Sequence, residues 1–109
     1  MASPKHHVLG TLRGISVTTV DQLKLLMYRI ALIQKFNVRC EAFEQFEPVG
    51  ATGVLVLAES HLSMHTYPET GEIYLDCFCC SEAFDPESCI ETIEEVTGAK
   101  GEWTVLLRR

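Results

Sequence analysis

The sequence has little positive charge and no long apolar segment. Its 109 residues include 9 Lys and Arg against 15 Asp and Glu, which gives a net charge of −6. No basic stripe is present to neutralise phosphates, so we expect no nucleic-acid partner, whereas a small cationic substrate is mildly favoured. No window approaches the roughly 20 apolar residues that span a bilayer, so we expect no membrane partner either.

Two further absences concern the N-terminus and the cysteines. No apolar run follows Lys5 and the two histidines after it, so the N-terminus lacks the pattern of a signal peptide. The five cysteines are an odd number. These features favour free thiols, and we expect a cytoplasmic protein without a disulfide framework. The length predicts a single domain over residues 1–109.

Two helices are predicted from apolar periodicity and capping signals. Thr19 and Gln22 fit a capping box before the first helix, whereas Asp85, Pro86 and Gly98 mark the start and the end of the second. The expected buried stripe of the first helix is Leu23, Leu26, Met27, Ile30 and Ile33. That of the second is Cys89, Ile90, Ile93 and Val96.

The remaining apolar segments read as strands. They are predicted at residues 8–15, 38–46, 54–58, 61–67, 72–79 and 102–107. In the second of these, Val38, Cys40 and Ala42 share one face, whereas Phe43 does not fit the alternation. The continuous apolar run 54–58 is typical of a strand buried on both faces. The pattern predicts an α+β fold, a two-layer sandwich of an antiparallel sheet with two helices on one face.

The two strands around the turn 68–71 form a hairpin with two unlike faces. Its apolar face is Leu62, Met64, Ile73, Leu75, Cys77 and Cys79. Its other face is His61, Ser63, His65, Tyr67, Tyr74, Asp76, Phe78 and Cys80, with no Lys or Arg in either arm. We infer that this second face packs against a second copy of the chain or a ligand. The alternative is a polar face exposed to solvent.

Two common kinds of site fit this hairpin poorly. Residues four apart on a strand stand about 13 Å from each other, so His61 and His65 cannot share one zinc ion, and we expect no metal. A Cys/His hydrolase could pair Cys80 with His61 or His65. No nucleophile elbow or oxyanion-hole motif supports it, and a lone cysteine near a histidine is more often part of a core.

A longer pattern is more specific. The segments 59–62, 65–69 and 76–80, together with Gly71, strongly resemble the small bacterial and archaeal S-adenosylmethionine decarboxylases. The upstream segment 46–54 also fits that family's Phe-x-Pro-x-Gly-x-Ser/Thr-Gly-Val motif. The resemblance covers nearly the whole chain in length and element order.

The resemblance implies a proenzyme that cuts itself between Glu59 and Ser60, into chains 1–59 and 60–109. In this family the serine hydroxyl attacks the preceding carbonyl carbon, and an N-to-O acyl shift gives an ester. Elimination leaves dehydroalanine, which hydrolyses to a pyruvoyl group. This group is the cofactor: it forms an imine (Schiff base) with the amine of the substrate and accepts electrons as CO2 leaves.

The resemblance also implies roles for further residues. His65 and Thr52 match positions that assist processing, and Cys80 matches the general acid that returns a proton to the α-carbon. Phe46 matches a ring that stacks on adenine, and Glu69 matches a carboxylate that binds the ribose hydroxyls. The family assembles as a homodimer of processed protomers whose sheets face each other.

The sequence departs from the family pattern at three places. Segment 5–8 replaces Gly-x-His-Leu, segment 79–81 replaces Thr-Cys-Gly, and Glu44 replaces the histidine two residues before Phe46. Glu44 or Glu47 near the pocket could pair with a substrate amine or guanidinium, and relatives of this family act on ornithine or arginine. The alternative is that both are solvated charges at a strand end.

The first interpretation is a carboxy-lyase that converts S-adenosylmethionine to its decarboxylated form and CO2, for spermidine and polyamine biosynthesis. The alternatives are a pyruvoyl-dependent ornithine or arginine decarboxylase and a non-catalytic partner subunit. The presence of Ser60, His65 and Cys80 argues against the last of these, because an inactive copy has no physical need for all three.

Overall fold

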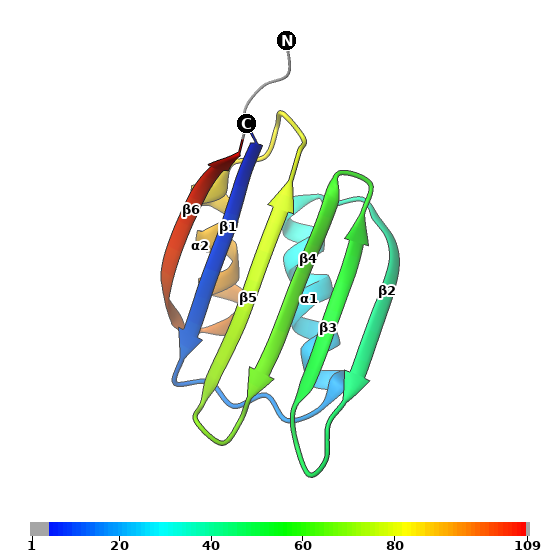
Figure 1. Cartoon of the computed structure of the whole chain (residues 1–109), viewed down its shortest axis with the longest axis vertical. Helices are drawn as coiled ribbons and strands as arrows, with labels where there is room; N and C mark the ends of the chain where they lie inside the picture. Colours follow the sequence, from blue (N-terminus) through cyan, green and yellow to red (C-terminus); the bar gives the residue numbers. More distant parts are fainter. Residues whose placement is uncertain (1–4, 109) are drawn as a thin grey trace.

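A computed structural model describes residues 5–108; the first four residues, which begin the N-terminal segment considered above, and Arg109 lie outside this range. The eight elements are β1 (Lys5–Arg13), α1 (Val20–Gln34), β2 (Val38–Gln45), β3 (Ala51–Leu57), β4 (Ser60–Tyr67), β5 (Glu72–Cys79), α2 (Pro86–Thr97) and β6 (Lys100–Arg108). Figure 1 shows one sheet with both helices packed on the same side, which confirms the predicted two-layer α+β fold.

The sheet has the strand order β2-β3-β4-β5-β1-β6, and all neighbouring strands are antiparallel. Its ends are unlike each other. The β3–β4 turn and the end of β5 lie at the upper end in Figure 1, whereas the β2–β3 loop and the β4–β5 turn lie at the lower end. Strand β4 therefore runs from one end of the sheet to the other, and this sets the spacing of the functional residues.

Both helices begin and end where local chemistry predicts. The side chain of Thr19 accepts from the backbone N–H of Gln22, and the Gln22 side chain reaches back to the cap, which completes the capping box. The side chain of Asp85 caps α2 by accepting the N–H of Glu87, and Gly98 ends this helix with a φ of 72°. Among the described residues, neither helix is long and apolar enough to cross a membrane.

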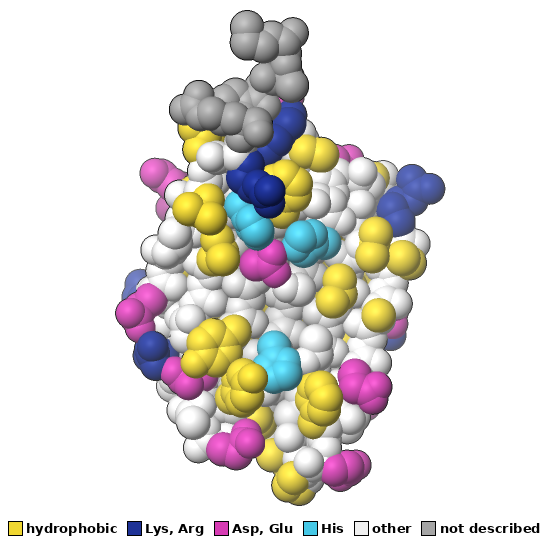
Figure 2. Space-filling view, in the orientation of Figure 1, with side chains coloured by type: hydrophobic (Ala, Val, Ile, Leu, Met, Phe, Trp, Pro, Cys, Tyr) yellow, Lys and Arg dark blue, Asp and Glu magenta, His cyan; other side chains and the backbone are white. Residues whose placement is uncertain are grey.

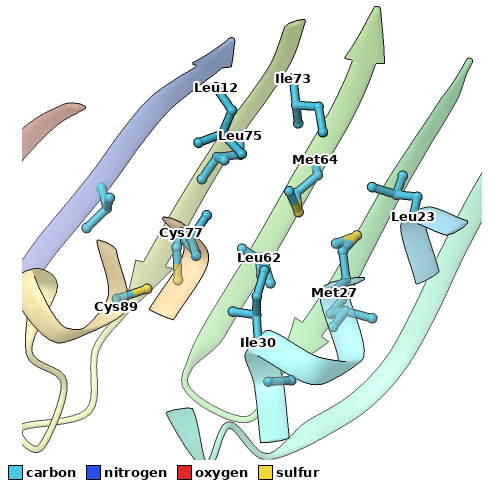
Figure 3. Close-up of a cluster of buried hydrophobic side chains, with 14 of the residues drawn as sticks. Leu12, Leu23, Met27, Ile30, Leu62, Met64, Ile73, Leu75, Cys77 and Cys89 are labelled. Atoms are coloured by element: carbon cyan, nitrogen blue, oxygen red, sulfur yellow. The ribbon is translucent and has the colours of Figure 1, made fainter. Parts of the chain in front are cut away.

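The core lies between the helices and the predicted apolar face of the hairpin (Figure 3). The largest fully buried side chains include Leu23, Met27 and Ile30 of α1 and Leu62, Met64 and Ile73 of the hairpin. One predicted core residue is wrong: Ile33 is 54% exposed, and Ala31 completes the buried stripe of α1 in its place. All five cysteines are free, as predicted, and Cys77, Cys79 and Cys89 are buried.

A β-bulge explains the irregular alternation in β2. Val38 pairs with Leu57 and Cys40 with Val56, so one extra residue lies between the two pairs. The bulge turns both Val38 and Phe43 towards the helices, where they pack against the core. The expectation that Val38 shares a face with Cys40 is wrong, because alternation cannot reveal an extra residue.

Strand β3 is buried on one face rather than two. Ala51, Leu55 and Leu57 face the helices and are buried, whereas Val56 on the opposite side is 42% exposed. The predicted burial of residues 54–58 on both faces is therefore wrong for a single chain. Val56 belongs instead to the face of the sheet that carries no helix.

Candidate active site

The side of the sheet turned away from the helices is here called the open face, and Figure 2 looks onto it. In the two central strands it consists of His61, Ser63, His65 and Tyr67 of β4 and Tyr74, Asp76 and Phe78 of β5. Their alternation with buried neighbours matches the sequence prediction. Figure 2 shows histidine, acidic and hydrophobic side chains along the middle of this face.

At the upper end, Glu59 and Ser60 lie at the turn that joins β3 to β4. The carbonyl oxygen of Glu59 accepts two hydrogen bonds from Cys80, one from its backbone N–H and one from its Sγ, both at 2.9 Å. Strand pairing supports this contact, because Ser60 lies opposite Cys79. The structure thus brings together Glu59, Ser60 and Cys80, three of the residues predicted from the sequence.

The backbone of Ser60 has a φ of 148°. Residues other than glycine rarely adopt such an angle, and the conformation costs on the order of 1–3 kcal/mol. The strain is located at the residue that follows the doubly hydrogen-bonded carbonyl. Two donors on one carbonyl oxygen also stabilise the negative charge that develops there when a nucleophile attacks the carbon. This geometry suits attack on the Glu59 carbonyl by the adjacent hydroxyl.

A cavity of about 500 Å³ opens beside Cys80 at the same end of the sheet. Lys5, Cys80 and Phe84 are among the residues that line it, and the Lys5 ammonium donates to the Cys80 carbonyl at 3.4 Å. The Cys80 side chain is exposed, so its thiol is accessible to a small molecule.

A second group of predicted residues lies at the lower end. Thr52 and His65 face each other across β3 and β4, and the hydroxyl of Thr52 hydrogen-bonds to Nδ1 of His65. The ring of His65 is 5.6 Å from Phe46 and 4.4 Å from Tyr67, centroid to centroid. A cavity of about 220 Å³ is lined by Phe46, His65, Tyr67 and Glu69, among others.

The two acidic residues that depart from the family pattern occupy different places. Glu44 is exposed on β2, directly opposite Thr52, and therefore lies in the same cross-strand row as His65. Glu47 is exposed too and contributes to the wall of the 220 Å³ cavity. Both carboxylates are thus close to the lower group.

The two groups are far apart within one chain. Ser60 and His65 are separated by five residues along β4, which corresponds to about 16 Å on an extended strand. Thr52, Phe46 and Glu69 lie with His65, whereas Glu59 and Cys80 lie with Ser60. One sheet therefore carries two separate groups of predicted residues, which are here called the upper and lower half-sites.

A third cluster lies between them, and sequence reasoning missed one of its members. Nε2 of His7 and Nε2 of His61 are each 2.8 Å from the same oxygen of Asp76, Oδ2, and the hydroxyl of Ser63 donates to the other oxygen. Burial raises the pKa of Asp76, but the hydrogen bonds from Ser63, His7 and His61 outweigh it and lower the pKa overall. His7 comes from β1, and only the β1–β5 register, which no local motif encodes, reveals its place.

Comparison with known proteins settles the family. The family model for S-adenosylmethionine decarboxylase matches residues 6–109. The chain belongs to the S-adenosylmethionine decarboxylase family. Among its relatives is the S-adenosylmethionine decarboxylase proenzyme of Symbiobacterium thermophilum, 38% identical over 97 residues, which cover 86% of this chain and 74% of the relative. The proenzyme of Caldicellulosiruptor saccharolyticus is 35% identical over 106 residues, covering 94% and 86% of the two chains.

A solved structure agrees with these sequence relatives. The crystal structure of the adenosylmethionine decarboxylase from Aquifex aeolicus matches with a TM-score of 0.88 and 26% identity. The match covers 99% of this chain and 92% of that one. The family resemblance predicted from the motifs is therefore confirmed, and so is the fold class.

Proposed function

We propose that the chain is a self-processing, pyruvoyl-dependent carboxy-lyase that converts S-adenosylmethionine to its decarboxylated form and CO2. The observation that carries this proposal is the convergence of two Cys80 donors on the Glu59 carbonyl, next to a strained Ser60. The names of the relatives favour S-adenosylmethionine over ornithine or arginine as the substrate. Decarboxylated S-adenosylmethionine would serve spermidine and polyamine biosynthesis.

Self-processing begins with attack of the Ser60 hydroxyl on the Glu59 carbonyl carbon. The C–N bond breaks, the amine takes up a proton, and an ester forms between the two residues. Loss of the Ser60 α-proton and of the Glu59 carboxylate then leaves dehydroalanine, and water releases ammonia from it. The products are chain 1–59 with a free carboxylate and chain 60–109 with an N-terminal pyruvoyl group. The Cys80 donors stabilise the oxyanion of the first step.

The residues around Ser60 fit this group, because the strained backbone, the polarised carbonyl and the thiol all adjoin the position where it arises. The pyruvoyl group would supply an electron sink for the loss of CO2. Cys80 would then donate a proton from Sγ to the substrate α-carbon. Its exposed position beside the 500 Å³ cavity gives the thiol access to such a carbon.

The lower half-site would bind the rest of the substrate. Phe46 offers an exposed ring for stacking on adenine, and Glu69 offers a carboxylate to the ribose hydroxyls from the wall of the same cavity. Glu44 would add negative charge beside this group, which favours a cationic substrate. The hydrogen bond between Thr52 and Nδ1 of His65 orients the imidazole, which would move protons during processing.

Separation of the two half-sites implies a homodimer. His65 cannot reach Ser60 of its own chain over about 16 Å of strand. If two open faces pack against each other about a two-fold axis perpendicular to the strands, the upper end of one sheet meets the lower end of the other. Each complete site would then combine Ser60 and Cys80 of one chain with Phe46 and His65 of its partner. Exposed apolar side chains on the open face, such as Val56 and Tyr74, would be covered.

An assay of CO2 release tests the activity. The purified wild-type chain is supplied separately with S-adenosylmethionine, ornithine and arginine, each labelled at the carboxyl carbon. We expect release from S-adenosylmethionine alone, and none from any of the three with the Ser60→Ala variant. Release from ornithine or arginine alone would refute the proposed substrate. Unchanged activity of Ser60→Ala would refute the mechanism.

A further inference from the structure

The middle of the open face holds a cluster that the proposed reaction does not use. Its ligand-type atoms are Nε2 of His7, Nε2 of His61 and a carboxylate oxygen of Asp76, and all lie within 4.8 Å of one another. They come from β1, β4 and β5, three adjacent strands of one rigid sheet. We propose that these three residues form a binding site for a zinc-type divalent cation.

The donor set matches this class of ion. Two imidazole nitrogens and one carboxylate oxygen, with a fourth position left to water, are a common arrangement for zinc held at a non-structural site. Ions such as Mg²⁺ and Ca²⁺ prefer oxygen ligands throughout, so two imidazoles disfavour them. The sequence prediction of no metal considered His61, His65 and the three cysteines of the hairpin, but not His7. His7 supplies the second imidazole from a different strand.

The distances leave room for an ion after a small movement. Ligands about 2.0–2.1 Å from a tetrahedral zinc lie roughly 3.3 Å from one another. The two Nε2 atoms are now 2.8 Å from Asp76 Oδ2, so each pair must open by about half an ångström. Rotation of the partly exposed rings supplies this movement. On binding, each ring gives up the Nε2 proton that it now donates to Asp76 and carries its proton on Nδ1, so that Nε2 can bind the ion.

The surroundings also suit a metal site. Ser63 donates to the second oxygen of Asp76 and fixes the carboxylate, which leaves Oδ2 turned towards the two rings. The rings of His7 and His61 are 6.3 Å apart and nearly perpendicular, so the two approach the same point from different directions. In the single chain the side chains of His7, His61 and Asp76 are 17%, 37% and 26% exposed, so none of them is sealed inside the core.

The test is zinc binding to the full-length chain, measured by competition with a chromophoric chelator in metal-free buffer. We expect one zinc ion per chain, and a loss of affinity of roughly 100-fold or more for His61→Gln and for Asp76→Asn. The matched control is His6→Gln, which removes a histidine next to His7 that points to the other face of the sheet, and it should bind zinc as the wild type does.

Cysteine thiols are the competing zinc ligands, and the design separates them from the cluster. The Co²⁺-loaded protein should lack the sulfur-to-metal charge-transfer band that thiolate ligands produce. Absence of saturable binding at micromolar zinc would overturn the proposal, and so would wild-type affinity in His61→Gln or a thiolate band. Circular dichroism checks folding, and His7→Asn replaces any variant that does not fold. Because the readout is metal binding, failure here leaves the decarboxylase proposal untouched.

Discussion

Cys80 hydrogen-bonds to the backbone carbonyl of Glu59, which precedes Ser60, and two tasks are therefore proposed for Cys80. Its N–H and Sγ both contact the carbonyl that must be attacked during processing. Its thiol is also the acid proposed for turnover. A substitution of the Cys80 side chain removes the Sγ donor but leaves the backbone N–H donor in place, so mutation can separate the two tasks.

The Cys80→Ala variant should therefore still cut itself, more slowly, because one of the two donors to the Glu59 carbonyl remains. Its decarboxylation rate should fall by roughly 10²- to 10⁴-fold, the usual contribution of a positioned general acid. The cut fraction is measured by mass spectrometry and the rate by CO2 release from the cut enzyme. Normal turnover would show that another group delivers the proton.

At the level of single residues, motifs assigned roles but not contacts. The sequence placed Ser60, His65 and Cys80 in the proposed chemistry, and alternation placed His65 correctly on the open face. It gave no indication that the Cys80 thiol touches the Glu59 carbonyl, because that contact depends on how β4 pairs with β5. The positive φ of Ser60 could not be predicted from the sequence either, because the turn as a whole sets this dihedral angle.

At the scale of elements, one large side chain adds to the strand pairing that joins β6 to β1. Trp103 lies opposite Gly10 of β1, and a Cβ built on Gly10 would lie 2.3 Å from its ring. Nε1 of Trp103 and the N–H of Gly101 both donate to one oxygen of Glu94 at 2.9 Å, which joins β6 to α2. The glycine is required so that the indole can lie flat on the sheet.

The Gly10→Ala substitution should lower the free energy of unfolding by about 1–3 kcal/mol, because the added methyl group overpacks the site of the indole ring. Urea denaturation measures this loss. Thr104→Ala, on exposed β6 one residue from Trp103, is the control and should change stability by no more than about 0.5 kcal/mol. An equally mild effect at Gly10 would contradict the close packing of Trp103 on β1.

The Glu94 interaction should depend on pH. Hydrogen bonds from Trp103 and from the Gly101 N–H lower the pKa of Glu94 below its ordinary value of 4.5. A carboxyl group whose pKa is lower in the folded state stabilises the fold above its unfolded pKa, and this stabilisation disappears as the pH falls through the folded value. The stability advantage of the wild type over Glu94→Gln should therefore be constant near neutral pH and shrink below pH 4.5. Denaturation curves across that range measure it, and an advantage that grows on acidification would contradict the interaction.

Elements were easier to predict than their faces. Helix caps at Thr19 and Asp85 are local, so the sequence located both helices correctly. The bulge in β2 and the exposure of Ile33 were missed, because both depend on how an element meets the rest of the fold. The apolar run in β3 predicted burial on both faces, which a single chain does not provide; the proposed dimer would cover the second face.

At the scale of the whole molecule, the separated half-sites make the dimer essential to the proposed chemistry. Motifs in the sequence assigned Ser60, Cys80, Phe46 and His65 to the proposed chemistry. The motifs did not reveal that Thr52 lies with His65 whereas Cys80 lies with Glu59, because this depends on how the strands pair. The extended length of β4 separates Ser60 from His65 by about 16 Å, so under the proposed mechanism the two residues would come from different chains.

Co-expression of two inactive variants tests this arrangement. Ser60→Ala has no nucleophile, and His65→Ala lacks the proposed processing imidazole, so neither should cut when expressed alone. In a mixed dimer, the Ser60 of the His65→Ala chain meets the intact His65 of its partner. We expect cutting to return in that chain, up to the fraction of mixed dimers.

The matched control co-expresses the His65→Ala variant with a double variant that carries both Ser60→Ala and His65→Ala. No chain of this pair has an intact His65, so the His65→Ala chain should stay uncut. If mixed dimers form and stay uncut, each chain must process itself without its partner, and the shared-site model fails. Tagged chains distinguish which of the two is cut.

The most direct measurement of the central claim is the intact mass of the purified wild-type protein. The account predicts two chains, residues 1–59 with a free C-terminal carboxylate and residues 60–109. The second should be lighter than a chain beginning with serine by the mass of one ammonia, because its first residue has become a pyruvoyl group. A single uncut chain that nevertheless decarboxylates S-adenosylmethionine would contradict the account.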